Sequence, residues 1–339
     1  MAMANRITKN MHIETLRGMA ILLVVLGHVI GPGPEGGMKI DYPHPLRYLY
    51  IWIDYIQMPL FTAIAGWVYA MKPVLDYRLF VKKKTLRLLV PMIVVVMAYF
   101  LLQYLIPGTN NKGELTQIWK LFIFPYSLYW YLPSLFLIFI IQCIIDKQKG
   151  METPLNFIVL LLIFYFCNII ERYYIPSVIP NFFSFRGALN QLPYFLIGVG
   201  LFRFKSFFIN NVKIKIVSII AAIIGAVLLQ FEWKYTLTNE FLYELFQPLW
   251  SIFTLVLLLN YSSIVVPLFS SLGQYAYSIY LFHGFCTAGG RIVLKLLGLN
   301  NVYVLFVCIS LIALFVPILL EKILVKYRWS RICFLGLSS

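Results

Sequence analysis

An arginine and a histidine share one apolar stretch near the start of the chain, ETLRGMAILLVVLGHVIG (residues 14–31). Arg17 and His28 are eleven residues apart. At about 100° per residue this spacing is three helical turns plus about 20°, so a helix would project both side chains from one face, roughly 16 Å apart along its axis. A charge and an imidazole on an apolar helix indicate a functional site. The alternative is that Arg17 extends to lipid headgroups while His28 only packs and hydrogen-bonds within the protein.

Two further cations begin a later apolar stretch. In KKKTLRLLVP, Lys84 and Arg87 are three residues apart and would occupy neighbouring positions on one helix. Such a basic run is typical of an anchor at the cytoplasmic membrane surface. Arg87 lies deepest, however, and with Arg17 it could form a pocket for phosphate groups, because guanidinium groups bind phosphate oxygens bidentately and stay charged when partly desolvated. Glu14, one turn before Arg17, most simply pairs with it and so belongs to the same candidate donor site.

Aromatic and imidazole side chains recur further along the chain. In QYAYSIYLFHGF, Tyr277, Tyr280 and His283 follow one another at three-residue steps, which is one face of a helix. Tyr277 is expected to belong to a packed aromatic stripe, whereas a second histidine at membrane depth needs partners inside the bundle. Tyr280 and His283 are therefore candidate substrate contacts. Trp130, in WYLPSLF, is either an aromatic-belt anchor or part of the site.

The elements that position these residues are predicted to be membrane helices. The chain has 339 residues, of which 61% are hydrophobic and only 12% charged, a composition too apolar for a soluble domain of this size. We therefore expect an all-α integral membrane protein, a polytopic bundle of about ten transmembrane helices that forms a single transmembrane domain over residues 1–339. The spans are expected near 12–31, 48–71, 86–106, 128–145, 154–170, 187–202, 216–230, 241–260, 274–290 and 301–321.

The basic residues set the expected orientation, since ten spans put both termini on the same side of the membrane. If that side is the cytoplasm, the inside segments hold eighteen Lys and Arg residues and the outside segments nine. The positive-inside rule therefore predicts cytoplasmic termini, with Arg17 near the cytoplasmic boundary and His28 in the outer half of the bilayer. The formal charge of +15 then reflects membrane topology and not nucleic-acid binding.

Several kinds of site are not supported by the residue types and their spacing. The five cysteines are scattered, with no C-x-x-C pair or Cys/His ligand spacing, so we expect neither a disulfide framework nor a metal site. There is no Walker-type or dinucleotide glycine motif, and a Ser/His/Asp triad lacks its members. The remaining candidate groups are an imidazole base towards the outside and phosphate-binding cations towards the inside.

These residues resemble the membrane-bound acyltransferase 3 family, and within it the fucose 4-O-acetylase-like bacterial proteins. The resemblance covers most of the chain in six ordered blocks, LRGMAILLVVLGH, QMPLFTAIAGWVY, KKKTLRLLVP, YWYLPSLF, LPYFLIGVGL and YSIYLFH. In the first, Arg17 and His28 match the family's signature of an arginine, ten residues and a histidine. The resemblance implies a multi-pass enzyme that moves an acyl group, usually acetyl from cytoplasmic acetyl-CoA, to extracytoplasmic carbohydrate. It also implies an acid/base or acyl-handling role for His28 and donor binding by the basic positions of the first and third spans.

The chain departs from the family pattern at three positions. The third span of the family usually carries two arginines three residues apart, whereas the first is here Lys84, which keeps the charge but loses the bidentate fork. The second-span block usually reads H-M-P-L-F and ends in Ser-Gly, whereas this chain has Gln57 and Ala65. These changes concern the polar contacts of that helix and not the family assignment.

The predicted function is that of a membrane O-acyltransferase of the bacterial cell membrane, most simply an O-acetyltransferase acting on a cell-surface polysaccharide or its lipid-linked precursor. Arg17, Lys84 and Arg87 would hold the phosphates of acyl-CoA, and His28 would deprotonate the acceptor hydroxyl. Acyl-CoA is then a donor substrate, and no permanently bound cofactor is expected. The expected partners are this donor, a carbohydrate acceptor and the lipid bilayer. The other candidate contacts are Glu14, Trp130, Tyr280 and His283.

Two other classes of function fit the same composition. A polysaccharide exporter or flippase would also have an aromatic vestibule and intramembrane charges, although the sequence has no internal repeat of the kind that marks many transporters. A non-catalytic partner of a polysaccharide synthase would tolerate replacement of His28. Binding of CoA is expected only of the acyltransferase, and it therefore separates the enzyme from the exporter.

Overall fold

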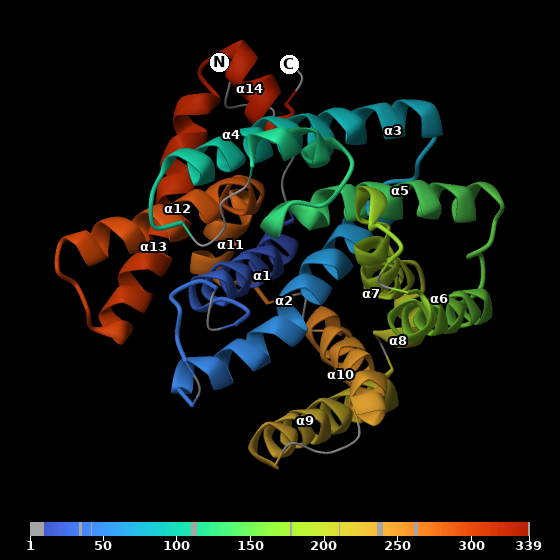
Figure 1. Ribbon diagram of the computed structural model, residues 1–339. Helices are drawn as coiled ribbons and strands as arrows, with labels where there is room; N and C mark the ends of the chain where they lie inside the picture. The colour runs from blue at the N-terminus through green and yellow to red at the C-terminus, as the bar shows by residue number, and fades with distance from the viewer. Residues whose placement is uncertain are drawn as a thin grey trace.

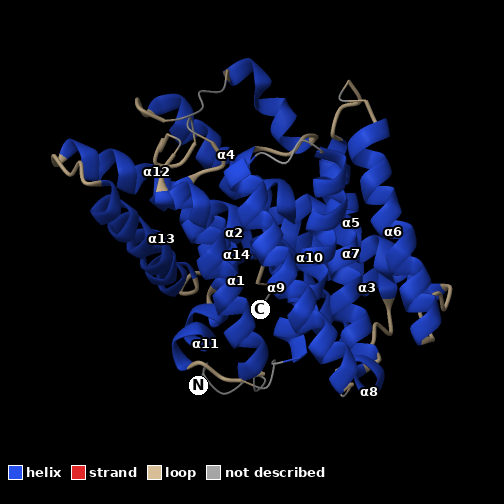
Figure 2. Cartoon of the chain, turned by 90° about the horizontal axis from the view of Figure 1, so that it is seen from below, coloured by secondary structure: helices blue, strands red, loops and turns tan. Residues whose placement is uncertain are grey.

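The computed structural model describes residues 10–33, 36–41, 43–109, 114–176, 178–209, 211–235, 240–260 and 264–337. This part of the chain consists of helices and their connections, without a strand (Figures 1 and 2). The all-α prediction is therefore confirmed for the residues described.

Each predicted span coincides with a helix. These helices are α1 (Met11–Ile30), α2 (Pro45–Ala70), α4 (Val90–Leu105), α5 (Tyr131–Lys147), α6 (Pro154–Tyr174), α7 (Phe185–Arg203), α9 (Val212–Tyr235), α10 (Glu240–Asn260), α12 (Ala276–Leu296) and α13 (Val302–Leu324). Among the described residues, five helical stretches are long and apolar enough to cross a membrane, namely Met11–Ile30, Tyr77–Leu105, Leu115–Lys147, Pro154–Tyr174 and Val302–Leu324. The count of ten crossings and the cytoplasmic termini stay predictions.

Shorter elements connect these helices. They are α3 (Tyr77–Lys84), the π-helical turn η1 (Thr85–Leu89), the 3₁₀ turns η2 (Leu115–Phe122), η3 (Ser127–Trp130) and η4 (Phe182–Ser184), and the helices α8 (Lys205–Phe208), α11 (Pro267–Gln274) and α14 (Arg328–Leu335). The helix of the third span begins earlier than its apolar run because α3, η1 and α4 are continuous. Asp76 starts it as an N-cap, since its Oδ1 accepts a hydrogen bond of 3.0 Å from the Leu79 N–H.

Helix α1 lies in the interior and contacts α2, α11, α12 and α13 (Figure 1). Its central residues Ala20, Ile21 and Val24 are fully buried. The first half of α1 approaches α11 backbone to backbone, because a Cβ added at Gly18 would lie 1.8 Å from the Phe269 carbonyl oxygen. Only glycine fits such a crossing. The position of α1 between its neighbours is therefore closely fixed.

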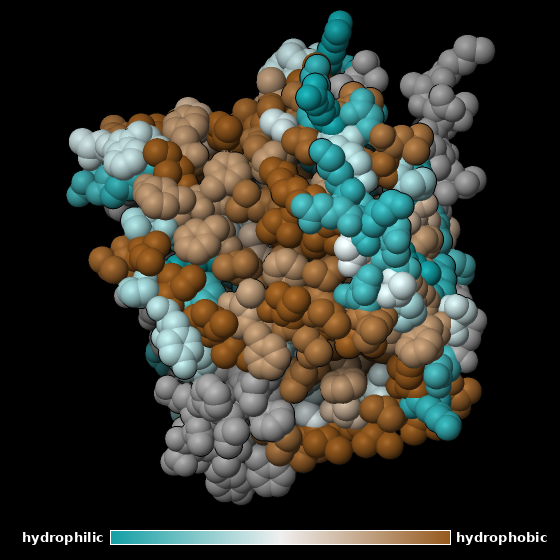
Figure 3. Space-filling model, turned by 90° about the vertical axis from the view of Figure 1, so that its right-hand side faces the viewer, coloured by the Kyte–Doolittle hydropathy of each residue, from teal (hydrophilic) through white to brown (hydrophobic). Residues whose placement is uncertain are grey.

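The outer surface of the molecule is apolar. The face shown in Figure 3 is hydrophobic over much of its middle, with most of its hydrophilic residues in a band on the right-hand side and smaller groups on the left. Helix α6 contributes to the apolar exterior through Leu155, Leu162 and Phe166, which are 68%, 50% and 55% exposed. Large exposed apolar surfaces of this kind mark contact with a membrane. This apolar exterior is suited to face lipid.

Candidate active site

Two cavities lie beside α1, one near its first turns and one near its last. The first, of about 740 Å³, is here called the cation cavity, and Arg17 lies in its wall. The second, of about 430 Å³, is called the histidine cavity, and His28 lies in its wall. The spacing of these two residues on one helix therefore places them in two separate chambers.

The cation cavity brings together the three cations that the sequence singled out. Among the described residues, its charged lining side chains are Arg17, Lys72, Asp76, Lys83, Lys84 and Arg87. The single carboxylate in this set, Asp76, accepts the N-cap hydrogen bond of α3. Five cations against one carboxylate make the chamber suited to an anion.

Arg17 and Arg87 are held in different ways. Arg17 donates to Glu14 at 2.8 Å, as expected from their spacing, and Glu14 is buried. The guanidinium of Arg87 lies over the ring of Tyr277, with Cζ 4.1 Å from the ring centroid, and donates to the carbonyl oxygen of Leu335 in α14. The Tyr277 hydroxyl in turn donates to the backbone carbonyl of Arg87. Among the residues described, no carboxylate forms an ion pair with Arg87, which is positioned by a ring and a backbone carbonyl.

A π-helical turn shapes the part of the cavity that carries Lys84 and Arg87. Lys84 ends α3 and Arg87 lies within η1, so the two are not separated by ordinary helical geometry. Turns of this kind are frequent at functional sites. The Lys84 ammonium lies 3.8 Å from the ring centroid of Phe139. Both cations still line the same cavity, although each is held by a different aromatic ring.

Tyr277 was expected in a packed aromatic stripe, and its ring does pack on Arg87. The structure also places Tyr277 in the wall of the cation cavity. Its three-residue step from Tyr280 was visible in the sequence, but its contact with the third span was not. The two tyrosines of α12 consequently face different chambers, since Tyr280 lines the histidine cavity.

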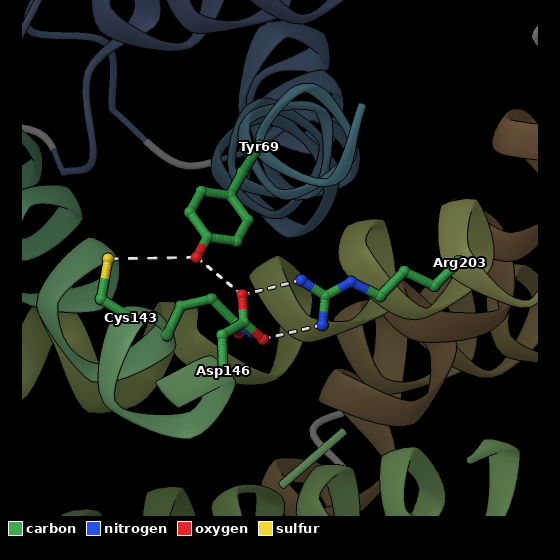
Figure 4. Close-up of polar contacts among 5 residues, drawn as sticks. Tyr69, Cys143, Asp146 and Arg203 are labelled. Atoms are coloured by element: carbon green, nitrogen blue, oxygen red, sulfur yellow. Dashed lines mark hydrogen bonds and ion pairs between the residues drawn. The ribbon is translucent and has the colours of Figure 1, made fainter. Parts of the chain in front are cut away.

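A hydrogen-bonded cluster supports the wall of the cation cavity (Figure 4). The hydroxyl of Tyr69, a lining residue from α2, donates to Asp146 of α5 at 2.7 Å. Arg203 of α7 donates to both oxygens of the same carboxylate, each at 2.7 Å, and the Cys143 sulfur lies 3.9 Å from the Tyr69 hydroxyl. The cluster joins three helices, and its bidentate pair of Arg203 with Asp146 neutralises the carboxylate. The carboxylate therefore does not repel an anion in the chamber.

The histidine cavity contains three of the sequence candidates, His28, Trp130 and Tyr280. His283 is fully buried and is not among the lining residues described. Its ring instead lies beside that of His28, with the centroids 5.1 Å apart and the planes at 40°. The polar partner that a second intramembrane histidine requires is thus found next to the first one.

Further polar side chains in this cavity were missed by the sequence analysis. Asp54 accepts hydrogen bonds from the Tyr50 hydroxyl at 3.1 Å and from Gln57 Nε2 at 2.8 Å. Arg291 donates to the backbone carbonyls of the loops after α1 and α4, at Gly37 and Gly108. A carboxylate inside a predicted span was an available signal for Asp54. The pairing of Arg291 with two distant loops had no sequence signal.

Gln57, one of the departures from the family pattern, lies next to the first helix. A Cβ added at Gly27 would lie 2.6 Å from Gln57 Oε1, so glycine at this position lets the amide approach α1. That Oε1 has no hydrogen-bond partner among the described residues. Ala65, the other departure on this helix, lines the cation cavity. Each of the two residues therefore lines a chamber, Gln57 the histidine cavity and Ala65 the cation cavity.

Three rings, here called the aromatic partition, lie between the chambers. They are Phe61, which lines the cation cavity, Tyr280, which lines the histidine cavity, and Tyr131, whose ring contacts the rings of the other two. The Phe61 centroid lies 6.2 Å from that of Tyr280 and 5.9 Å from that of Tyr131. The Tyr280 hydroxyl donates to the Leu128 carbonyl, and the Tyr131 hydroxyl is hydrogen-bonded to Thr62. The Phe61 ring has no hydroxyl and cannot be held by a hydrogen bond of this kind.

An all-helical chain with an apolar exterior and two polar internal chambers defines a membrane protein with an enclosed site. The family model described as an acyltransferase domain matches residues 12–322, nearly the whole chain, and the protein belongs to this acyltransferase 3 family. The resemblance to the acyltransferase 3 family is therefore confirmed, whereas the fucose 4-O-acetylase-like subtype stays a prediction. The protein is a membrane acyltransferase. Searches of curated proteins and of solved structures gave no significant match.

A metal centre is not formed by the residues that the structure describes. No three His, Cys, Asp or Glu side chains in these ranges come close enough to hold an ion.

Proposed function

We propose that this membrane acyltransferase moves an acetyl or similar short acyl group from cytoplasmic acyl-CoA to a hydroxyl of a cell-surface polysaccharide or its lipid-linked precursor in a bacterial plasma membrane. The observation that carries the proposal is the placement of Arg17 and His28 in the walls of two different chambers, with the rings of Phe61 and Tyr280, one from each wall, in contact. One chamber suits an anionic donor and the other an uncharged acceptor.

The donor is assigned to the cation cavity by its charge. Coenzyme A carries a diphosphate and a further phosphate on its ribose, and guanidinium and ammonium groups bind such oxygens through charge-assisted hydrogen bonds. Arg17, Lys84 and Arg87 supply these donors, with Lys72 and Lys83 as further cations in the wall. A volume of about 740 Å³ lies within the usual range for small-molecule sites.

The acceptor is assigned to the histidine cavity because its wall combines hydrogen-bonding side chains of both signs with aromatic rings. Asp54 and Gln57 offer oxygens to sugar hydroxyls, Arg291 offers N–H donors, and Trp130 supplies a flat apolar face. Ligand sites commonly combine an aromatic surface with a few placed polar groups in this way. His28 lies in the same wall and is half-buried, so its ring can contact a bound hydroxyl.

His28 acts as the general base in this proposal. It takes the proton of the acceptor hydroxyl while that oxygen attacks the thioester carbonyl carbon. The tetrahedral intermediate then collapses, the carbon–sulfur bond breaks, and the departing sulfur takes the proton from His28. One ester and one free thiol are formed, with no net release of a proton. The pantetheine arm must reach across the aromatic partition, and its length suits the ~16 Å between the two residues on α1.

Binding of CoA fragments tests the donor assignment directly. Purified protein in lipid nanodiscs is titrated with CoA, with dephospho-CoA, which lacks the ribose phosphate, and with pantetheine, which lacks all phosphates. We expect thermal stabilisation to decrease in that order. Lys120→Ala, at an exposed cation outside both cavities, is the matched control and should not change the order. Absence of a CoA shift, as expected of an exporter, would refute the donor site.

Transfer is then measured with radiolabelled acetyl-CoA and carbohydrate acceptors. Label in the carbohydrate supports the acyltransferase, and release by mild alkali identifies an O-ester. CoA binding without label in any carbohydrate would refute the acceptor class while leaving the donor site in place.

A further inference from the structure

We propose that His283 is a positioning residue that fixes the tautomer and the orientation of His28, so that the two imidazoles act as a pair. The consequence for catalysis rests on the proposed function, but the pairing itself does not. In this arrangement His283 acts through His28 and does not touch either substrate.

The location of His283 supports an indirect role. It comes from α12, is fully buried, and lies outside the described lining of both cavities. Its ring is 5.1 Å from that of His28, which does line a cavity and is half-buried. His283 is therefore next to His28 but outside the described wall of the chamber.

The backbone of α12 determines which nitrogen of His283 carries the proton. Nδ1 lies 3.0 Å from the carbonyl oxygen of Ile279 and 2.8 Å from that of Tyr280. Carbonyl oxygens only accept hydrogen bonds, so Nδ1 must donate. In a neutral ring Nε2 then carries a lone pair and can only accept. This tautomer follows from the helix itself and does not depend on a substrate.

The lone pair on His283 Nε2 is the unexplained feature of the site. Nε2 is buried and has no hydrogen-bond partner among the described residues. A buried acceptor without a donor destabilises the fold. Tyr280, whose ring is 5.9 Å from that of His283, cannot supply the donor because its hydroxyl is given to the Leu128 carbonyl. The adjacent ring that carries an N–H is that of His28.

An N–H of His28 donated to this acceptor would orient the base. The other nitrogen of His28 then keeps its lone pair and is free to face the acceptor hydroxyl in the cavity. After His28 has taken a proton, its N–H⁺ points at the lone pair of His283, which stabilises the new charge. A buried carboxylate plays the corresponding role for the histidine of a serine hydrolase triad. Here a neutral imidazole, locked by its own helix, takes that place.

Nitrogen-15 solid-state NMR of the full chain in liposomes tests the pairing, because imidazole shifts report the tautomer. The chain has only four histidines, so single substitutions assign every signal. We expect His283 to carry its proton on Nδ1 and His28 to occupy one neutral tautomer. In His283→Asn the short amide can still donate to the backbone but lacks an acceptor at the Nε2 position, so His28 should show both tautomers. In His283→Gln an amide oxygen reaches that position and should restore one.

His44→Gln is the matched control for this measurement. His44 caps α2 through its Nδ1, which accepts from the Leu46 N–H, and it lies outside the histidine cavity. Its replacement should leave the His28 signals unchanged. A His28 spectrum that is the same in the parent protein and in His283→Asn would overturn the pairing. A variant that fails to fold is recognised by loss of the remaining histidine signals, and the Gln variant then carries the test.

Kinetics separate positioning from substrate contact. If His283 orients the base, His283→Asn should lower kcat by about 10- to 100-fold, with unchanged acceptor KM and CoA affinity, and His283→Gln should recover most of it. A raised acceptor KM with unchanged kcat would show that His283 contacts the substrate, which contradicts the proposal. If the parent protein transfers no acyl group, the proposed function fails, and the NMR result still decides the pairing.

Discussion

The two chambers beside α1 differ in how their polar groups are held. In the cation cavity, Lys84 and Arg87 lie against aromatic rings and Arg87 reaches a backbone carbonyl, so their positive charge is left largely uncompensated. In the histidine cavity, Asp54 is hydrogen-bonded to neutral groups, and His28 lies beside another imidazole. The first chamber, with five cations and one carboxylate in its described wall, is suited to bind an anion, whereas the second, with one carboxylate and one guanidinium, is suited to orient a hydroxyl-bearing substrate. Substitutions in the cation cavity should therefore weaken donor binding, whereas substitutions in the histidine cavity should lower the rate of acyl transfer.

Replacement of His28 should give the largest effect. Both His28→Ala and His28→Gln should reduce acyl transfer by about 10²- to 10⁴-fold, because neither side chain can take a proton. CoA affinity should be unchanged, since the phosphates would bind in the other chamber. Single-turnover transfer and CoA titration on the same preparation measure both quantities. A folded His28→Gln enzyme with nearly full activity would remove the base from the mechanism.

Loss of the guanidinium groups should affect binding first. Arg17→Ala and Arg87→Ala should each weaken CoA binding by about 1.5–3 kcal/mol, roughly 10- to 150-fold, as expected for a charge-assisted hydrogen bond. Isothermal titration with CoA measures this, and pantetheine should be unaffected. Lys84→Arg should be tolerated. Because Arg17→Ala also leaves buried Glu14 without its partner, the double variant with Glu14→Gln is the control for stability. If CoA affinity is unchanged in both alanine variants, these arginines do not bind the donor and serve only to set the membrane topology.

Phe61 provides a test of the boundary between the chambers. Phe61→Ala should let longer acyl chains pass the aromatic partition, and we expect relative use of butyryl-CoA over acetyl-CoA to rise about tenfold. Competition between the two donors measures this ratio directly. Phe166→Ala on the exposed apolar face is the matched control. An unchanged ratio would mean that the donor arm does not pass Phe61.

The smallest perturbation tests whether the chambers open to opposite sides. Asn300 lies after α12, at the end that carries Arg291, and Glu152 lies after α5, beyond Asp146; both are exposed. In a variant without native cysteines, Asn300→Cys should react with an impermeant maleimide on intact cells and Glu152→Cys only after lysis. Neither substitution should change activity. The reverse labelling pattern would reverse the direction of transfer.

The sequence predicted those features that depend on local helical geometry. The positions of Arg17 and His28 follow from the periodicity of one helix, and their separate chambers agree with that spacing. Lys84 and Arg87 were placed near each other because three residues are less than one turn. The early start of the third helix was not predicted, because the apolar run marks the expected membrane segment and the cap at Asp76 marks the helix. Hydropathy indicates which residues lie in the membrane, whereas the capping residue indicates where the helix begins.

Contacts between distant helices were beyond the reach of the sequence. The Tyr69, Asp146 and Arg203 cluster joins three helices, and each residue alone is an unremarkable part of its segment. The packing of His283 against His28 depends on how α12 meets α1, which no spacing encodes. The sequence did flag His283 as a buried polar group in need of a partner. It could not say that the partner was the other histidine.

The aromatic partition has a consequence for the cell as well as for the reaction. If the chambers open to opposite sides of the membrane, the three rings form part of the barrier between two aqueous entrances. Ions that crossed there would discharge the membrane potential. Tyr131 and Tyr280 are tethered by hydrogen bonds, so rotation of the single phenyl ring of Phe61 could admit a slender acyl arm while the rest stays shut. The protein would then remain an electrical insulator between and during turnovers.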